Sequence, residues 1–351
     1  MWIYIAKRVA LMVPTLLGIL VVTFAIIQFV PGGPVEQLVQ QLKGDGQQFG
    51  EVASRTGNVY RGNRGVDAAK LAEIRALYGF DRPPVERFWK MVRGFVVFDL
   101  GTSFFYDKSV WQLIRDKLPV SISLGLWSFV LTYLVSIPLG IAKAVRHGSR
   151  FDLVTSSAIL VGYAVPGFVL GVALLALLGG GSFLQLFPLR GLTSDDWAQL
   201  SPAGKVLDYL WHLALPLTCL VVGSFAVTTM LTKNTVLEEI RKQYVVVARA
   251  KGLDERAVLY KHVFRNALIP IVTGFPAAFI GAFFTGSLLI ETLFSLDGLG
   301  LLSYDAVIKR DYPVVLGTLY FFSLIGLVAK LINDIAYVWV DPRVQFGDLS
   351  R

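Results

Sequence analysis

The chain has 351 residues, of which 54% are hydrophobic and 17% are charged, and its mean hydropathy is +0.60. Soluble domains carry about 25% charged residues. The charges are also segregated between long apolar runs, which excludes a uniformly apolar soluble protein and indicates a protein that crosses a membrane several times. The net charge of +8 does not indicate nucleic-acid binding, because the basic residues flank the apolar runs, where membrane proteins place them.

The first apolar run, residues 9–30, follows Lys7 and Arg8 and ends at the helix-stopping sequence Pro-Gly-Gly-Pro. A helix of this length spans the roughly 30 Å of bilayer hydrocarbon at about 1.5 Å per residue. The run is longer than the apolar part of a signal peptide, and no small-residue cleavage site follows it. We therefore expect residues 1–30 to form a retained N-terminal transmembrane helix.

Residues 31–118 contain no apolar run of membrane length. Within them, residues 43–65 are rich in Gly, Gln, Asn and Arg, a composition typical of a surface loop. Apolar periodicity predicts a short helix at 68–77 and a second one that opens at Pro84 and carries Trp89. The segment is expected to be an extracytoplasmic insertion that leans on the membrane through its aromatic side chains.

Five further apolar segments of membrane length follow the insertion. They lie at about 120–142, 153–178, 209–231, 267–290 and 313–340. Each contains Pro or Gly, which membrane helices tolerate because neighbouring helices and waters satisfy the freed backbone groups. The prolines include Pro138, Pro166, Pro216 and Pro276. Residues 119–343 are therefore predicted to form a core of five transmembrane helices with a tail at 344–351, so the fold class is an all-α membrane protein with six transmembrane helices.

The basic residues of the loops indicate the orientation. The segments 143–150 and 232–266 carry three and eight Lys or Arg residues, whereas 179–208 and 292–312 carry two each. The positive-inside rule places the first two of these loops, and with them both termini, in the cytoplasm. The long segment between the first two spans escapes the rule because it exceeds about 60 residues.

The cytoplasmic segment 238–270, called the hairpin below, is not linker-like. Its first helix is expected to end at Gly252, because glycine adopts a positive φ without a Cβ clash. Asp254 can cap a second short helix, with Glu255 in its first turn, and Pro270 marks the start of the next span. We expect a helix, a glycine turn and a second helix lying across the cytoplasmic face. This chemistry fits two functions equally: docking to another protein, or resting on anionic lipid heads.

Two segments of the hairpin, 248–253 (ARAKGL) and 265–270 (RNALIP), resemble the EAA signature of permease subunits in bacterial ATP-binding-cassette importers. The sequence Val-Val-Ala at 246–248 stands where the general signature has Glu-Ala-Ala, a departure that is usual in the dipeptide/oligopeptide branch. Further elements similar to that branch are 99–103, 118–119, 136–140, 291–295, 298–300, 310–313 and 341–343. Three other segments, 31–35, 187–191 and 230–234, resemble the Yej-type permeases, which import peptides and microcin C.

The resemblance implies a type I importer permease of a bacterial inner membrane, which moves peptides or peptide-like compounds inward by alternating access. Its partners would be a homologous second permease subunit, cytoplasmic ATP-binding subunits and an extracytoplasmic solute-binding protein, besides peptide substrate and membrane lipid. No Walker A pattern occurs, so ATP and Mg would bind to the partner ATPases, and the chain itself would be no enzyme and would hold no cofactor. The segment after Gly252 would couple to the ATPase. The coupling residues so implied are Ala248, Gly252, Leu253, Asp254, Arg256, Val258, Leu259 and His262.

Three acidic or lysine residues fall within the predicted spans or at their edges. Glu291, at the outer end of the fifth span, is either a gate or cavity residue or a side chain that faces water. Lys330 and Asp334 are i, i+4 neighbours in the last span and are expected to pair, which lowers the cost of placing either charge there. Direct contact with substrate is the alternative for this pair. No metal site is expected, because the three histidines lie at three different interfaces.

Two other functions compete with an importer permease. An ion-coupled secondary transporter would show internal repeats and several carboxylates or broken helices at the midplane, whereas this sequence has one ionisable pair near one face. An intramembrane serine protease is disfavoured because the G-x-S-x-G elbow is absent and no histidine lies inside a span. Co-purification separates the three functions, since only the permease predicts bound ATPase subunits.

Overall fold

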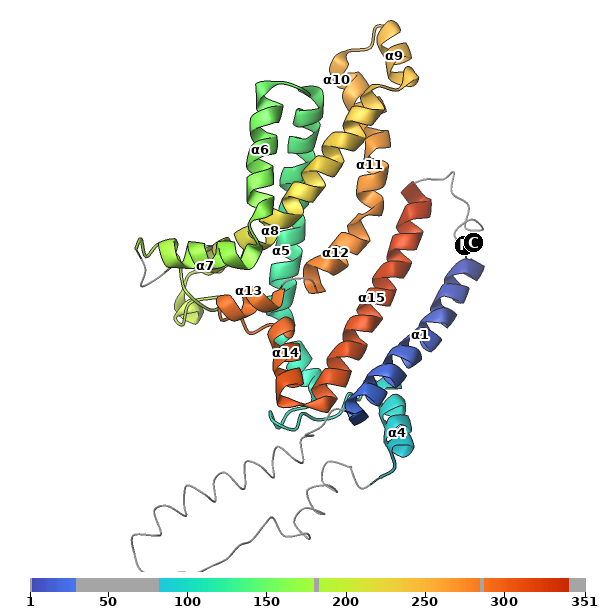
Figure 1. The fold of residues 1–351 in the computed structure, drawn as a ribbon, viewed down its shortest axis with the longest axis vertical. Coiled ribbons are helices and arrows are strands. Elements are labelled where there is room, and N and C mark those ends of the chain that lie inside the picture. The colour runs from blue at the N-terminus through green and yellow to red at the C-terminus, as the bar shows by residue number, and fades with distance from the viewer. Residues whose placement is uncertain (1, 30–81, 180–182, 285–286, 341–351) are drawn as a thin grey trace, which may run out of the picture. The chain divides into compact units, whose positions relative to one another are not determined.

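The structure, a computed structural model, describes residues 2–29, 82–179, 183–284 and 287–340 (Figure 1). Every regular element in these ranges is helical. The chain divides into two compact units. The first comprises Met1–Arg8, Lys117–Leu302 and Ile325–Arg351, and the second comprises Val9–Asp116 and Ser303–Leu324. The predicted loop at 43–65 and the predicted helix at 68–77 lie outside the described residues.

Four helices of the described ranges are long and apolar enough to cross a membrane. They are α1 (Trp2–Phe29), α5 (Val110–Val145), α8 (Pro202–Ile240) and α15 (Tyr312–Val340). They confirm that the apolar runs near 9–30, 120–142, 209–231 and 313–340 are continuous helices. Pro138 and Pro216 lie inside α5 and α8 without interrupting them, so proline is tolerated there as expected.

The predicted span at 153–178 is not a straight helix. It consists of α6 (Arg150–Ala164) and α7 (Gly167–Leu178), which are bent by 92° at their junction. Val165 is extended there, with φ −88° and ψ 117°, because a proline disfavours helical backbone in the residue before it. The expectation that Pro166 lies within a continuous helix is therefore wrong.

The predicted span at 267–290 is divided among three shorter helices. They are α11 (Phe264–Thr273), α12 (Phe275–Phe284) and α13 (Ser287–Leu293). The longest of them has 10 residues, too few to cross the hydrocarbon alone. The described residues thus hold four spanning helices, or five when the bent pair α6–α7 counts as one span.

The hairpin continues from the last turn of α8, and its elements α9 and α10 are labelled at the top of Figure 1. It contains α9 (Gln243–Ala250), α10 (Glu255–Ala257) and the π-helical turn η2 (Val258–Val263). α10, η2 and α11 follow one another without a break, so Pro270 lies inside a helix instead of starting a new one. The expectation of a separate short second helix is wrong: Ala267 of α11 packs into the same core under the hairpin as Val258 and Val263 of η2.

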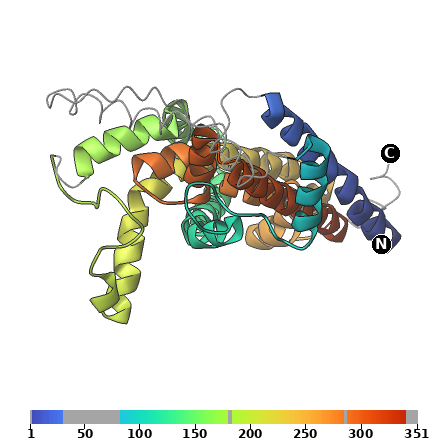
Figure 2. The same cartoon turned by 90° about the horizontal axis from the view of Figure 1, so that it is seen from below.

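The remaining elements are α4 (Pro84–Val96), the 3₁₀ turn η1 (Trp197–Gln199) and α14 (Leu299–Lys309). α4 confirms the predicted helix that begins at Pro84. Proline suits the first helical position because the N–H that it lacks would have no partner within the helix. The segment before α8 runs back along the first turns of that helix (Figure 2). Trp211 holds it there by donating from Nε1 to the carbonyl oxygen of Leu186 at 3.1 Å and by stacking its ring on Phe187.

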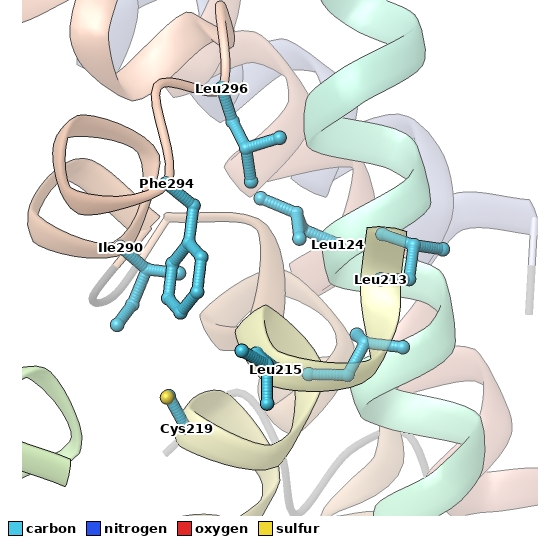
Figure 3. Packing of buried hydrophobic residues seen from close by; sticks show 8 residues of the cluster. Leu124, Leu213, Leu215, Cys219, Ile290, Phe294 and Leu296 are labelled. Atoms are coloured by element: carbon cyan, nitrogen blue, oxygen red, sulfur yellow. The ribbon is translucent and has the colours of Figure 1, made fainter. Parts of the chain in front are cut away.

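The first unit has an apolar core between α5, α8 and α13 (Figure 3). Its buried members are Leu124, Leu213, Leu215, Leu217, Cys219, Ile290, Phe294 and Leu296. Because these residues come from three well-separated parts of the sequence, their burial joins the short helix α13 to the two long helices. The core thus holds the end of the broken segment α11–α13 in place.

α5 and α8 cross closely at Gly140. A Cβ added to Gly140 would lie 2.5 Å from Thr232 Cβ and 2.9 Å from the carbonyl oxygen of Thr229. One turn earlier, Ser136 donates from Oγ to the carbonyl oxygen of Phe225 at 3.2 Å. Small residues of this kind allow helix backbones to approach in a membrane bundle.

We predict that Gly140→Ala destabilises the protein, whereas Gly223→Ala does not. The added methyl group at 140 overpacks the crossing and costs on the order of 1–3 kcal/mol. Gly223 also lies in a helix, but a Cβ there meets nothing within 4 Å, and alanine raises helix propensity by about 1 kcal/mol. Thermal unfolding followed by size-exclusion chromatography in detergent measures both; equal unfolding temperatures for the two variants would contradict the close crossing.

Candidate functional site

A small apolar core fixes the hairpin to the bundle. Its buried members are Ala144, Val236, Val245, Ala248, Val258, Val263 and Ala267. Ala144 belongs to α5 and Val236 to α8, whereas the others come from the two arms of the hairpin and the start of α11. The hairpin therefore packs on the ends of two long helices, and its outer face has a defined orientation.

The turn between the two arms is built as the sequence predicts. Gly252 has φ +79° and donates from its N–H to the carbonyl oxygen of Arg249 at 2.9 Å, which closes α9. Its requirement for glycine is conformational, because a Cβ there would meet nothing within 4 Å. Asp254 then caps α10 by accepting from the N–H of Arg256 at 3.1 Å. The glycine turn and the aspartate cap are both confirmed.

The outer surface of the hairpin combines apolar and basic side chains. Its exposed apolar residues are Val246, Val247, Leu253 and Tyr260, with exposed fractions of 58%, 51%, 42% and 58%. Its exposed basic residues include Arg249, Lys251 and Arg256. Arg249 is held across the turn by Glu255, with Nε to Oε1 at 2.8 Å and Nη2 to Oε2 at 3.1 Å. Apolar centres with a polar and basic surround are typical of protein-binding surfaces.

The structure separates the eight implied coupling residues into two groups. Ala248 and Val258 are buried in the core, and Leu259 and His262 are half-buried. The exposed ones are Gly252, Leu253, Asp254 and Arg256. Sequence reasoning missed Val246 and Val247, although the i, i+3 spacing of two buried residues in α9 places both on the opposite face.

Glu239, in the last turn of α8, joins that helix to α9. It accepts hydrogen bonds from Tyr244 Oη at 2.6 Å and from Lys242 Nζ. The hydrogen bond from Lys242 to this carboxylate raises the pKa of Lys242, and burial raises the pKa of Tyr244. Both shifts move these pKa values further above neutral, and both groups are protonated hydrogen-bond donors at neutral pH.

A buried cluster of charges lies where α5, α6 and α8 meet. Asp152 receives Lys233 Nζ at 2.7 and 2.8 Å on its two oxygens and Lys143 Nζ at 3.1 Å. The ammonium group of Lys143, whose side chain is fully buried, also donates to Thr155 Oγ1 at 2.7 Å and Ser156 Oγ at 2.8 Å. The positive-inside argument counted both lysines as loop residues; the structure buries the Lys143 side chain fully and leaves that of Lys233 12% exposed.

Asp334 does not have the partner that its sequence predicts. Its Oδ2 lies 2.9 Å from Arg8 Nη2 and accepts from Tyr4 Oη at 3.0 Å. Lys330 is exposed, and no ion pair of the described residues includes it. The expected i, i+4 pair is wrong because an arginine from another helix, whose Nε also bonds to the tyrosine hydroxyl, reaches the carboxylate.

Glu291 is completely buried, so the expectation that it faces water is wrong. Its Oε2 accepts from the N–H of Leu301 at 2.7 Å, in the first turn of α14, while Ser121 Oγ accepts from the N–H of Leu299 at 2.9 Å. A carboxylate at a helix N-terminus satisfies free N–H groups and stabilises the helix dipole. A Cβ on Gly298 would lie 2.5 Å from the Glu291 carboxyl carbon, which explains the glycine there. Capping thus accounts for the burial of Glu291 without a substrate.

A groove of about 210 Å³ lies between α5, α8 and α12. The polar residues that line it, Ser128, Thr132, Tyr133, Ser224 and Thr228, all carry hydroxyl groups, and no charged side chain lines it. The Tyr133 ring packs edge-on against Phe275, with centroids 4.4 Å apart. Such a surface offers neutral hydrogen-bonding groups beside apolar ones. No group of three or more His, Cys, Asp or Glu side chains in the described ranges is placed to hold a metal ion.

Comparison with known proteins identifies the family. The family described as binding-protein-dependent transport system inner membrane component matches residues 136–346. The peptidoglycan transport system permease protein YejB of Agrobacterium fabrum is 54% identical, and the inner membrane ABC transporter permease protein YejB of Escherichia coli O157:H7 is 51% identical, each over 98% of both chains. The dipeptide transport system permease protein DppB of Escherichia coli K12 is 30% identical over 97% of this chain and 98% of its own. The chain belongs to this family of transport permeases.

The permease family match begins at Ser136, which bonds to α8 at the close crossing, and includes both the buried charge cluster and the hairpin. The resemblance to dipeptide/oligopeptide and Yej-type permeases is confirmed over nearly the whole chain. The chain is therefore an inner-membrane transport permease with several apolar helices.

We predict that Asp152→Ala lowers the amount of folded permease strongly, whereas Asp297→Ala does not. Removing Asp152 leaves two lysines without their carboxylate, and breaking a buried ion pair costs about 3–5 kcal/mol. Asp297 also pairs with a lysine, Lys117, but its side chain is 68% exposed, and exposed pairs contribute about 0–1 kcal/mol. Quantifying monodisperse protein extracted from equal amounts of membrane tests this; similar yields for the two variants would refute it.

Proposed function

We propose that the chain is one of two permease subunits of an ATP-binding-cassette importer that moves peptides or peptide-like compounds into a bacterial cell. Its partners are a homologous permease, two ATP-binding subunits or one fused pair, and an extracytoplasmic solute-binding protein. ATP and Mg bind to the ATPases, whose hydrolysis drives alternating access. The observation that carries the proposal is the hairpin, which is rigidly mounted and exposes an apolar and basic surface.

The fold in this proposal is the type I permease fold with six transmembrane helices. Four of the six spans are α1, α5, α8 and α15. In chain order, the bent pair α6–α7 is the third span and the segment α11–α13 is the fifth. The domain organisation is an N-terminal helix at 1–30, an extracytoplasmic insertion at 31–118, a core at 119–343 and a tail at 344–351. Both termini lie in the cytoplasm, since the exposed basic residues of the hairpin still favour that side after Lys143 and Lys233 are discounted.

The length of α8 favours a protein partner for the hairpin over a lipid surface. α8 has 39 residues and is therefore about 58 Å long, whereas bilayer hydrocarbon is about 30 Å thick. The predicted span ends near residue 231, so the remaining turns carry the hairpin about 13 Å further along the helix axis. A hairpin at this height can enter a groove of a cytoplasmic ATPase, whereas an interfacial helix would lie at the level of the lipid heads.

The substrate class rests on the relatives and on the groove. The relatives are named for transport of peptidoglycan and of dipeptides, and peptide bonds are common to both. A groove lined by neutral hydroxyls and aromatic rings can bond to peptide N–H and C=O groups and does not select the charge of the side chains. Microcin C, which carries a peptide, falls within this class.

We predict the topology from the same argument. A reporter enzyme that folds only outside the cytoplasm should be active when fused at Tyr106 or Gly191, and inactive when fused at Ser149 or Arg256. Each fusion site lies between two predicted spans, and successive connections between spans lie on alternate sides of the membrane. The control is a cytoplasmic reporter at the same four sites, which should show the opposite pattern. Activity of the first reporter at Ser149 would overturn the six-span proposal.

We predict that Gly252→Val uncouples the permease from its ATPase, whereas Gly252→Asn does not. Valine strains the positive-φ turn by on the order of 1–3 kcal/mol, while asparagine adopts this conformation readily. The strain re-aims the arm after the turn without unfolding a bundle held by its own cores. Capture of the ATPase subunits and substrate-stimulated ATP hydrolysis in vesicles should fall for valine only. Normal capture and stimulation with valine at 252 would refute the coupling role.

A second pair of variants tests the surface itself. Leu253→Ser removes an exposed apolar contact from the hairpin, and we expect weaker capture of the ATPase at unchanged permease levels. The matched control is Leu207→Ser, an exposed leucine 68% accessible near the start of α8, which should leave capture unchanged. Equal loss in both variants would indicate a general effect on the protein, and no loss in either would exclude Leu253 from the interface.

A further inference from the structure

α4 is an amphipathic helix whose two faces differ in chemistry. Phe88, Met91, Val92 and Phe95 are half-buried or buried, at the i, i+3, i+4, i+7 spacing of one helix face. The other face exposes Glu86, Trp89, Lys90 and Arg93. A helix with one apolar and one basic face is typical of helices that lie in a membrane interface, and an exposed tryptophan is typical of the interfacial layer.

The contacts of α4 place it at the end of a membrane span. The Phe88 ring meets the Phe24 ring of α1 edge-on, with centroids 5.3 Å apart, and Arg87 donates from Nη2 to Gln28 Oε1 at 2.7 Å. Both partners lie in the last two turns of α1. The predicted span at 9–30 matches the hydrocarbon thickness at about 1.5 Å per residue. The last turn of α1, and with it α4, therefore lies at the boundary between the hydrocarbon and the lipid head groups.

Basic side chains gather around a shallow groove on the outer face of α4. The groove has a volume of about 380 Å³ and is lined by Arg82, Glu86, Trp89, Lys90 and Arg93. Arg82 is neutralised by Glu86, with Nη1 to Oε1 at 2.8 Å. Among the ion pairs of the described residues none includes Lys90 or Arg93, so two positive charges remain for a ligand. Trp89, with an exposed fraction of 51%, lies between them and the ion pair in the sequence.

We propose that this groove binds the head group of an anionic phospholipid, with Lys90 and Arg93 on the phosphate and Trp89 at the level of the glycerol. The two unpaired charges match an anion, and arginine suits phosphate oxygens because its guanidinium presents several N–H donors. The indole is amphipathic and belongs to the interfacial layer. Exposed apolar residues at the end of the same helix, Val96 at 74% and Val97 at 73%, favour lipid over a soluble protein as the occupant.

The proposal predicts a lipid preference that depends on two charges. The full-length chain, purified in mild detergent, is titrated with phosphatidylglycerol or with phosphatidylcholine of the same acyl chains, and bound lipid is counted by native mass spectrometry. Phosphatidylglycerol should bind more tightly than phosphatidylcholine. Lys90→Gln with Arg93→Gln should weaken its binding about thirtyfold at one site, because each of the two basic residues near a lipid surface contributes on the order of 1 kcal/mol. The matched control, Lys90→Arg with Arg93→Lys, should keep the preference.

Two outcomes would overturn the proposal. One is an unchanged preference for phosphatidylglycerol in the glutamine double variant, which would place any lipid site elsewhere. The other is an unchanged preference together with lost capture of the solute-binding protein, which would make this face a protein-docking surface. Neither result depends on whether the chain transports peptides, because lipid binding is measured on the permease alone and capture requires binding without transport.

Discussion

The arrangement of the hairpin end of the bundle depends on one buried carboxylate. Asp152 of α6 receives Lys143 from α5 and Lys233 from α8, so three helices meet at a single negative charge. The hairpin core starts next to these contacts, at Ala144 on α5 and at Val236 on α8. Leaving a buried charge without its partner is strongly destabilising. The ends of the helices that carry the hairpin therefore cannot separate without breaking this cluster.

The cluster also explains how two lysines share one acid. The carboxylate alone would leave part of the ammonium hydrogens without partners, but Lys143 donates to Thr155 and Ser156 as well. These hydroxyls lie in the first turns of α6, close in sequence to the carboxylate. The buried ammonium group of Lys143 thus has a partner for each of its hydrogens, the third being the carbonyl oxygen of Asp152, and a satisfied buried polar group helps to fix one arrangement. The close crossing at Gly140 lies one turn from Lys143 and brings α5 and α8 to the separation that the network requires.

Features set by neighbouring residues could be predicted from the sequence. The turn at Gly252 and the cap at Asp254 follow from short-range stereochemistry, and the apolar runs of α1, α5, α8 and α15 follow from their composition. Short-range stereochemistry and composition do not distinguish Pro166, where the helix breaks, from Pro138 and Pro216, which lie inside continuous helices. A tertiary contact accompanies the difference: a Cβ on Gly167 would lie 2.7 Å from the carbonyl oxygen of Cys219, so α7 begins in close contact with α8.

The partners of buried charges were the least predictable part of the site. The i, i+4 spacing along one helix predicted Lys330 as the partner of Asp334, yet the carboxylate of Asp334 pairs with Arg8 from the start of the chain. Lys233 is 81 residues from Asp152, and Glu291 bonds to the backbone of a following helix. Each choice is made by the tertiary fold, whereas the i, i+4 rule describes isolated helices. The same limit applied to the hairpin, where composition identified the exposed turn but not which valines of α9 point outward.

These contacts define two routes by which a movement of the hairpin can reach the rest of the permease. One runs through its apolar core to the ends of α5 and α8, where the Asp152 cluster and the Gly140 crossing resist separation. The other runs along the unbroken helix from Glu255 to Thr273 into the short helices α12 and α13. The first route is braced by buried charges, whereas the second contains the breaks that permit reorientation at little cost. We therefore expect an ATPase bound at Leu253 to move α12 relative to α5 and α8, because the two apolar cores hold α11 and α13 against those helices. This motion would open or close the groove that α12 shares with those two helices.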